Sequence, residues 1–181
     1  MSTNTKTEAL HEASRKLLAK GLNGFSLQEL AESLKIKKAS LFHHYPSKNA
    51  LAIELYRFYQ QAFIIWVEKT KHLPSEKQII AYAKELTSWI CDKNRVCPVG
   101  ALSLEWNLVD EQLQLEMKKL HDLHKKWLGN QFKELPLKVP RKDAVISTIA
   151  LIQGSVQLAR ITGKPDLVIQ NLKTHLKSLK V

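Results

Sequence analysis

The sequence has little cysteine and no long apolar run, and both scarcities exclude classes of protein. Its two cysteines, Cys91 and Cys97, are too few for a disulfide framework or for the ligand set of a structural zinc site. Such usage fits a reducing compartment, so we expect a cytoplasmic protein. Even the apolar stretch 144–159 is interrupted by Ser, Thr, Gln and Gly. It falls short of the roughly 18 apolar residues that cross a bilayer, so we expect no membrane association.

Acidic residues are also scarce relative to basic ones. The 181 residues include 28 Lys and Arg but 17 Asp and Glu, which gives a formal net charge of +11. This excess favours an anionic partner, because a basic protein releases counterions when it binds a phosphate backbone. Most of the excess lies in 1–50 and 131–181. Charge alone fits DNA, RNA or an acidic membrane surface equally.

Apolar residues recur at helical spacing along nearly the whole chain, and no stretch has a convincing strand pattern. Pro and Gly punctuate this pattern, with Pro46, Pro74, Pro136, Pro140 and Pro165 at the predicted breaks. The sequence therefore predicts an all-α fold of about nine helices. Beyond the first three, we expect helices at about 48–71, 75–93, 98–107, 110–134, 141–163 and 166–179.

Residues 26–45 have the pattern of a helix-turn-helix. Ser26-Leu-Gln-Glu29 is typical of a capping box, in which the hydroxyl and the carboxylate each satisfy a backbone amide at a helix start. Ala31 is small, as a close crossing of two helices requires. The apolar positions that would pack the pair are Leu30, Leu34, Ile36 and Leu41. A helical hairpin used only for packing has the same pattern, so this feature alone leaves the function open.

The outward-facing residues of this motif are mostly hydrogen-bond donors. No acidic residue occurs in 35–52. The donors on and beside the second helix are Lys37, Lys38, Ser40, His43, His44 and Lys48. Such a surface suits a phosphate backbone, and the alternative is an ordinary solvated basic helix.

The run from Phe25 to Leu51, FSLQELAESLKIKKASLFHHYPSKNAL, resembles the N-terminal domain of the TetR family of transcriptional regulators (TetR/AcrR type). The resemblance implies a three-helix DNA-binding domain at 1–47 and an effector-binding and dimerisation domain at 48–181, joined by a long helix at about 48–71. It also implies a protein that is no enzyme and uses no cofactor or metal. The implied DNA contacts are Ser26, Lys37, Lys38, Ala39, Ser40, Phe42, His43, His44 and Lys48, with Ser26 and Lys48 on phosphates.

Two residues depart from the family pattern. Phe42 stands where the family usually has Tyr, so it offers an apolar contact in place of a phenol hydrogen bond. Lys35 stands at a turn position where Gly is common. If the backbone there is left-handed, a non-glycine residue costs about 1 kcal/mol.

The resemblance implies that the last two long helices form a dimer, and a palindromic operator requires one. Ala150 and Gly154 are one turn apart, and small side chains let partner helices approach closely. The predicted interface residues are Ile149, Ala150, Gln153, Gly154, Gln157, Leu172 and Leu176. The alternative is that these helices complete a monomeric core.

The effector site is less distinct in the sequence, because an aromatic residue at helical spacing is more often plain core than ligand wall. The candidate lining residues are Phe63, Trp66, Trp89, Leu102, Trp106, Met117, Trp127 and His121. The stretch Cys97-Pro-Val-Gly-Ala-Leu-Ser-Leu-Glu105 resembles a Cys-Pro-x-Gly-x-Leu-x-x-Glu segment of one branch of the family. That branch includes repressors that respond to lipophilic or aromatic compounds, which remains an analogy for this chain.

Two smaller groups of residues have two interpretations each. His121, Asp122 and His124 lie close enough for a metal site, but the neighbouring lysines favour solvated or pocket-edge histidines. Cys91 or Cys97 could act as an oxidation switch, although inert packing is the simpler interpretation.

The leading hypothesis is a homodimeric DNA-binding transcriptional regulator. We expect a repressor released from a palindromic operator by a small apolar or aromatic effector, with the choice between repressor and activator left open. The alternative is an all-helical small-molecule-binding protein or enzyme that does not bind DNA.

Overall fold

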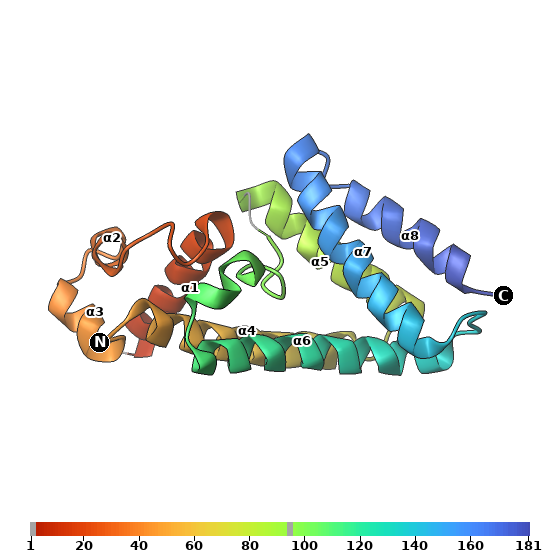
Figure 1. Cartoon of the computed structure of the whole chain (residues 1–181), viewed down its shortest axis with the longest axis horizontal. Coiled ribbons are helices and arrows are strands. Elements are labelled where there is room, and N and C mark those ends of the chain that lie inside the picture. The colour runs from red at the N-terminus through yellow and green to blue at the C-terminus, as the bar shows by residue number, and fades with distance from the viewer. Residues whose placement is uncertain (1–2, 94–95) are drawn as a thin grey trace. The chain divides into compact units, whose positions relative to one another are not determined.

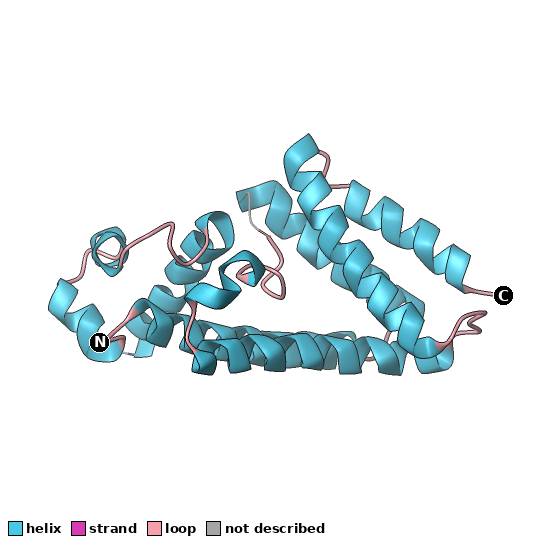
Figure 2. Cartoon of the chain, in the orientation of Figure 1, coloured by secondary structure: helices cyan, strands magenta, loops and turns pink. Residues whose placement is uncertain are grey.

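The computed structural model describes residues 3–93 and 96–181, and the side chains of 6–88 and 96–181. This part of the chain forms eight α-helices and two short 3-10 helices (Figures 1 and 2). Their bounds are α1 Thr3–Lys20, α2 Leu27–Ser33, α3 Lys38–His44, α4 Lys48–Thr70, α5 Ser75–Lys93, η1 Ser103–Leu108, α6 Glu111–Gln131, η2 Phe132–Glu134, α7 Arg141–Thr162 and α8 Leu167–Leu179. Its one β-type pairing is an isolated bridge between Leu137 and Lys180. The predicted all-α class is confirmed.

Some helix boundaries follow from local caps. The hydroxyl of Ser47 accepts a 3.0 Å hydrogen bond from the amide of Ala50 and so starts α4. The predicted helix at 98–107 differs: turns occupy 98–102, and η1 begins only at Ser103. Pro98 lacks an amide and Gly100 has low helix propensity, so a regular α-helix does not form there.

The chain divides into two compact units that are not continuous in sequence. Unit 1 comprises the residues up to Ala62 together with 98–120, and unit 2 comprises 63–97 and 121–181. This division by packing differs from the contiguous division expected after residue 47. The first part of α4 and the segment 98–120 pack with the N-terminal helices. The Tyr59 hydroxyl of α4 donates a 2.8 Å hydrogen bond to the Ser14 hydroxyl of α1. Both divisions keep the helix-turn-helix in one unit.

Unit 2 is built on α5, α7 and α8, which pack against one another. In Figure 1, α7 and α8 lie side by side and run in opposite directions. The buried stripe of α8 is Val168, Leu172, Leu176 and Leu179, at helical spacing.

Helix α7 is long and apolar enough to cross a membrane, judged by length and composition alone. Core helices of globular proteins have the same properties. Here Ala144, Val145, Ile152, Val156 and Ala159 of α7 are buried within the chain. Its apolar character therefore has an explanation in the packing of unit 2.

Candidate nucleic-acid interface

The helix-turn-helix forms as its capping box predicts. The Glu29 amide donates to the Ser26 hydroxyl at 3.1 Å, and the Ser26 amide donates to the Glu29 carboxylate at 2.7 Å. Helices α2 and α3 pack through Leu30, Ala31 and Leu41, each at most 2% exposed. The small side chain at 31 thus lies at the helix contact, where the sequence placed it.

Lys35 lies in the turn between these helices and has a left-handed backbone with φ of 54°. Its amide donates to the Glu32 carbonyl at 3.0 Å, and the Ile36 amide donates to the Ala31 carbonyl at 3.0 Å. These bonds reverse the chain immediately after α2. The turn position that the sequence indicated is therefore strained at a non-glycine residue.

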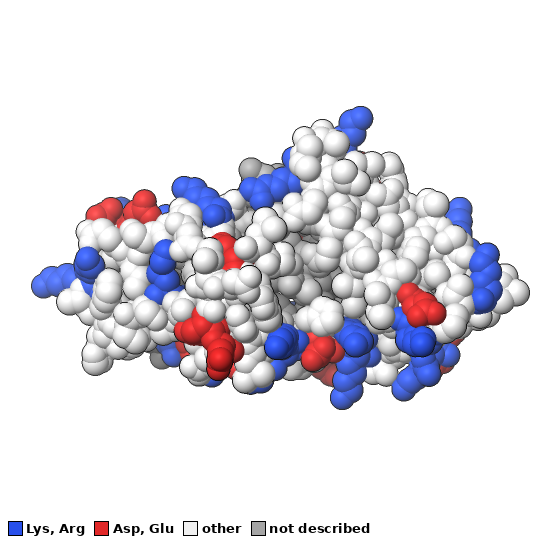
Figure 3. Space-filling model, in the orientation of Figure 1, with Lys and Arg blue, Asp and Glu red and all other residues white. Residues whose placement is uncertain are grey.

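The predicted DNA-contacting residues mostly face solvent. Lys37, Lys38, Ala39, Phe42, His43 and Ser26 are exposed, and Ser40, His44 and Lys48 are half-buried. Figure 3 shows acidic side chains over α2 and basic ones beside the start of α3. The face of α3 therefore offers donors and positive charge, as a DNA backbone requires.

Phe42 supports a neighbouring cation. The ammonium of Lys38 lies 5.2 Å from the centre of the Phe42 ring, in cation–π geometry, and Phe42 is 37% exposed. The ring thus holds Lys38 on the outer face of α3. The sequence did not predict this role for the residue that replaces the family's Tyr.

His43 and His44 form an edge-to-face pair with ring centres 5.2 Å apart at the end of α3. Desolvation lowers the pKa of His44, and the charges of His43 and Lys6 lower it further. The neutral form of His44 is therefore favoured relative to an ordinary histidine.

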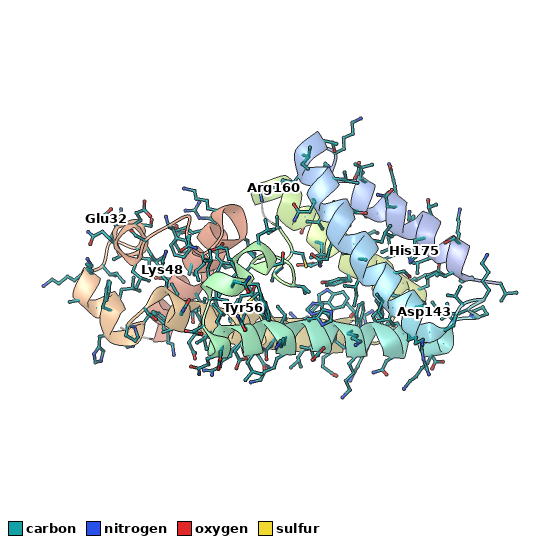
Figure 4. The ribbon with its side chains drawn as sticks, viewed as in Figure 1. Glu32, Lys48, Tyr56, Asp143, Arg160 and His175 are labelled. Carbon is teal, nitrogen blue, oxygen red and sulfur yellow. The ribbon has the colours of Figure 1, made fainter. Side chains whose placement is uncertain are left out.

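Lys48 has a different contact from the predicted one. Its ammonium donates to the carbonyl of Leu22 at 3.1 Å and to that of Phe25 at 3.2 Å (Figure 4). These bonds tie the start of α4 to the turn between α1 and α2. The structure thus adds an internal role for Lys48, which the local pattern did not reveal, and the phosphate contact stays a prediction.

The predicted dimer residues divide into two groups. Ala150, Gly154 and Gln157 of α7 are exposed, and Ile149 and Gln153 are half-buried. Leu172 and Leu176 of α8 are 0% and 1% exposed, so they pack inside unit 2 and do not lie on a surface. The sequence missed three large exposed apolar residues of α7, which are Ile146 (58%), Leu158 (51%) and Ile161 (79%). Their spacing with Ala150 and Gly154 is a helical stripe that the sequence contained.

Unit 2 contains a group of packed rings that we call the aromatic cluster: Phe63, Trp66, Tyr82, His124 and Trp127. Phe63 stacks on His124 with ring centres 3.7 Å apart and on Trp66 at 5.8 Å. Trp127 is 7% exposed, and its indole Nε1 is buried without a hydrogen-bond partner among the atoms that the structure describes. The aromatic cluster therefore contains one hydrogen-bond donor, Trp127 Nε1, that has no acceptor among the described atoms.

The other predicted effector residues are placed elsewhere. Leu102, Trp106 and Met117 belong to unit 1, where Lys118 lies over the Trp106 ring at 5.3 Å. His121 is half-buried, with its Nδ1 3.2 Å from the Asp122 carboxylate. The side chains of Trp89 and Cys91 lie outside the described residues. Tyr82 was not among the predicted lining residues, and His124 was considered only as a metal-site, solvated or pocket-edge histidine.

Cys97 lies in the interior of unit 2, and its side chain is only 2% exposed. Its sulfur accepts a 3.3 Å hydrogen bond from Gln153 Nε2 and lies 3.9 Å from the Tyr82 hydroxyl. Burial raises the pKa of Tyr82, and the neighbouring thiol adds to this. These contacts favour the packing interpretation of Cys97 over an oxidant sensor, because solvent scarcely reaches the sulfur.

Comparison with known proteins supports the same assignment for the N-terminal motif. Residues 10–55 match the family described as bacterial regulatory proteins, tetR family. An uncharacterised HTH-type transcriptional regulator from the lacX 3' region of Lactococcus lactis is 25% identical, over 97% of this chain and 95% of its own. This relative is described as a transcriptional regulator.

Solved structures share the fold across the whole chain. A TetR-family regulator from Agrobacterium tumefaciens has a TM-score of 0.90 at 22% identity and covers 98% of each chain. A TetR regulator from Legionella pneumophila has a TM-score of 0.89 at 21% identity, covering 99% of this chain and all of its own (100%). These two similarities, at identities below 25%, show a shared fold.

Proposed function

We propose that this chain, a DNA-binding transcriptional regulator of the TetR type, acts as a homodimeric repressor that a small aromatic effector releases from a palindromic operator. The observation that carries the proposal is the exposed, donor-rich face of α3 in a fully packed helix-turn-helix. We expect α3 to enter the major groove as the recognition helix, with α2 crossing the backbone.

The residues on and near α3 differ in the DNA groups that they could contact. Lys37, Lys38 and His43 are exposed donors, suited to phosphates and to guanine or adenine edges. Phe42 holds the Lys38 ammonium and presents its ring edge to sugar or a thymine methyl. Ser26 keeps a hydroxyl hydrogen for a phosphate, because its oxygen accepts the capping bond from Glu29.

The exposed stripe of α7 supports the dimer. Ile146, Ala150, Gly154, Leu158 and Ile161 recur every three or four residues and face out of unit 2. A side chain built at Gly154 would meet nothing within 4 Å in the described part of the chain, so a second helix has room to approach there. A stripe of this kind is costly to leave in water and fits a self-complementary two-fold contact.

The aromatic cluster supports the choice of effector. Flat aromatic compounds stack on rings such as Phe63 and Trp66, and the unpaired Trp127 Nε1 selects a hydrogen-bond acceptor on the ligand. Such a ligand releases DNA if it binds more tightly to a conformer in which the two α3 helices have the wrong separation. The protein would then act in the cytoplasm, where the operator lies.

The DNA-binding part is tested by fluorescence anisotropy on the DNA that flanks the gene. Lys38→Ala and His43→Ala should each weaken binding about tenfold. Lys38→Ala should also reduce the slope of log affinity against log salt concentration by about the value of one phosphate contact. Lys173→Ala, an exposed lysine of α8, is the charge-matched control and should bind as the wild type does. Absent or salt-insensitive binding by the wild type would contradict the proposal.

The effector part is tested by screening aromatic acceptors, such as quinones and hydroxybenzoates, for release of the bound operator. Trp127→Phe keeps the ring but removes the donor, and should weaken the response about tenfold. A response that is equal in this variant would show that Trp127 does not bind the ligand.

A further inference from the structure

The stretch from Cys97 to Glu105 is tied into the fold at successive residues. The carbonyl of Pro98 accepts a buried 3.0 Å hydrogen bond from the Tyr56 hydroxyl of α4 (Figure 4). The carbonyl of Gly100 accepts from the amide and the hydroxyl of Ser103 at 3.2 and 2.9 Å. Leu102 is fully buried. These contacts within unit 1 fix the position of η1 and so of Glu105.

Glu105 binds the turn that precedes the helix-turn-helix. Its carboxylate accepts hydrogen bonds from the amide of Leu22 at 2.8 Å, the amide of Asn23 at 3.1 Å and the side-chain amide of Asn23 at 2.8 Å. Hydrogen bonds to an ionised acceptor are about twice as strong as neutral ones. Gly21 has φ of 77°, and a Cβ there would collide with a Glu105 oxygen, so the turn is shaped for this carboxylate.

Lys48 binds the backbone carbonyls of the same turn, whereas Glu105 binds its backbone amides. Glu105 accepts hydrogen bonds from the amides of residues 22 and 23, and Lys48 donates hydrogen bonds to the carbonyls of residues 22 and 25. The next residue, Ser26, is the N-cap of α2. The direction of α2, and with it of α3, therefore depends on a turn held by one acid and one base.

Lys48 belongs to a helix that continues into unit 2, and Glu105 lies shortly after the point where the chain returns from unit 2. Helix α4 begins at Lys48 and leaves unit 1 after Ala62, and the chain re-enters unit 1 at Pro98, seven residues before Glu105. A change of conformation in unit 2 therefore has two covalent routes to the turn. Both routes end on the residues that precede the recognition motif.

We infer that Glu105 is a positioning residue for DNA recognition, which sets the half-site spacing that the dimer accepts by fixing the turn at 21–25. This inference rests on the proposed function, because spacing has a meaning only for a dimer on a two-part operator. A loosened turn lets α2 and α3 rotate together, so each half-site is still read while the separation of the two is no longer fixed.

The test compares operators whose half-sites have the native spacing or are moved apart by one base pair. Glu105→Gln cannot accept all three hydrogen bonds, and we expect its preference for the native spacing to fall roughly tenfold below that of the wild type. Glu111→Gln, in the first turn of α6, removes the same charge at an exposed position and should keep the preference. Hydrogen exchange of the Leu22 and Asn23 amides should be faster in Glu105→Gln only.

Asn23→Ala is the milder variant if Glu105→Gln does not fold. It removes one of the three hydrogen bonds at an exposed residue and should lower the spacing preference about threefold. Equal loss of affinity on both operators would indicate destabilisation only, and an unchanged preference would indicate no role; either result overturns the inference. A wild type that binds no operator contradicts the proposed function instead.

Discussion

Lys35 shows how a single residue is constrained by a turn. Its side chain is exposed, but its backbone has the left-handed conformation that connects α2 to α3. A residue with a Cβ is disfavoured there by contact with its own carbonyl. Two hydrogen bonds that close the turn impose this conformation. Any residue at position 35 must adopt it for these bonds to form.

Lys35→Gly should raise the free energy of unfolding by about 0.5 kcal/mol, since relief of strain exceeds the added flexibility of the unfolded chain. Urea unfolding measures this change. Glu32→Gly, inside α2, is the control and should lower the free energy of unfolding by about 1 kcal/mol. A destabilised Lys35→Gly would show that the turn is not strained.

The hydroxyl of Tyr45 is buried and makes no hydrogen bond among the described atoms. The whole residue is 1% exposed. Burial, with a smaller contribution from Glu54, raises its pKa to about 12. Tyr45→Phe should therefore leave the free energy of unfolding unchanged or raise it by up to about 1 kcal/mol.

Tyr56→Phe is the matched comparison for Tyr45→Phe, measured by the same thermal and urea unfolding. The Tyr56 hydroxyl donates to the Pro98 carbonyl, so its removal should cost about 1 kcal/mol. Equal losses in the two variants would mean that the Tyr45 hydroxyl does have a partner.

At the scale of elements, α4 and α6 are joined inside unit 1 by a buried carboxylate. Glu116 of α6 is 3% exposed and accepts hydrogen bonds from Gln60 at 2.9 Å and Lys119 at 2.8 Å, and Arg57 lies 3.6 Å away. Burial acts to raise its pKa, but these hydrogen bonds and charges outweigh burial and lower it. The acid is thus stabilised in its charged form.

Glu116→Ala should lower the free energy of unfolding by about 2 kcal/mol, because Gln60 and Lys119 lose the carboxylate that accepts their hydrogen bonds. Glu68→Ala breaks an exposed pair with Lys71 on α4 and should change nothing measurable. The contribution of Glu116 is present at neutral pH and is lost as pH falls through its lowered pKa. A stability of Glu116→Ala equal to that of Glu68→Ala would contradict this account.

Helices α7 and α8 meet at a histidine that titrates below its ordinary range. His175 Nε2 lies 3.1 Å from the Thr148 hydroxyl, and burial lowers the pKa of His175 from the ordinary 6.5. The unfolded chain therefore binds this proton first as pH falls. The contribution to stability is complete above pH 6.5 and declines below it.

Thermal unfolding between pH 8 and 5.5 should show this decline in the wild type, and His175→Gln should flatten it. His72→Gln, at an exposed position, should keep the wild-type dependence. A steeper loss of stability at low pH in His175→Gln would show that protonation of His175 does not destabilise the fold.

For the whole molecule, the exposed stripe of α7 is the contact that we propose for the dimer. Leu158 and Ile161 are 51% and 79% exposed in the single chain. A charge at Leu158 would have to be buried in the proposed dimer. Leu158→Glu should therefore weaken dimerisation about a hundredfold and reduce operator affinity with it.

Sedimentation velocity at micromolar concentration measures the effect of Leu158→Glu. Asn130→Glu, exposed on α6, adds the same charge away from the stripe and should remain dimeric. A Leu158→Glu variant that remains dimeric would place the interface elsewhere.

The sequence by itself determined most of the helices, the caps of α2 and α4, and the helix-turn-helix. Ser26 with Glu29, Ser47 and Ala31 act on neighbours a few residues away, and the α-helical period shows which side of a helix faces inward. The family resemblance extended this to DNA binding.

Only the tertiary structure decided which groups meet across long stretches of sequence. Period alone cannot separate a stripe that packs inside the chain from one that faces a second chain, so Leu172 and Leu176 were assigned to the wrong surface. Nor does it show that Lys48 and Glu105 hold the same turn, since those contacts span 23 to 83 residues. Hydrogen bonds of this kind depend on the position of backbone groups in the finished fold, which no local pattern specifies.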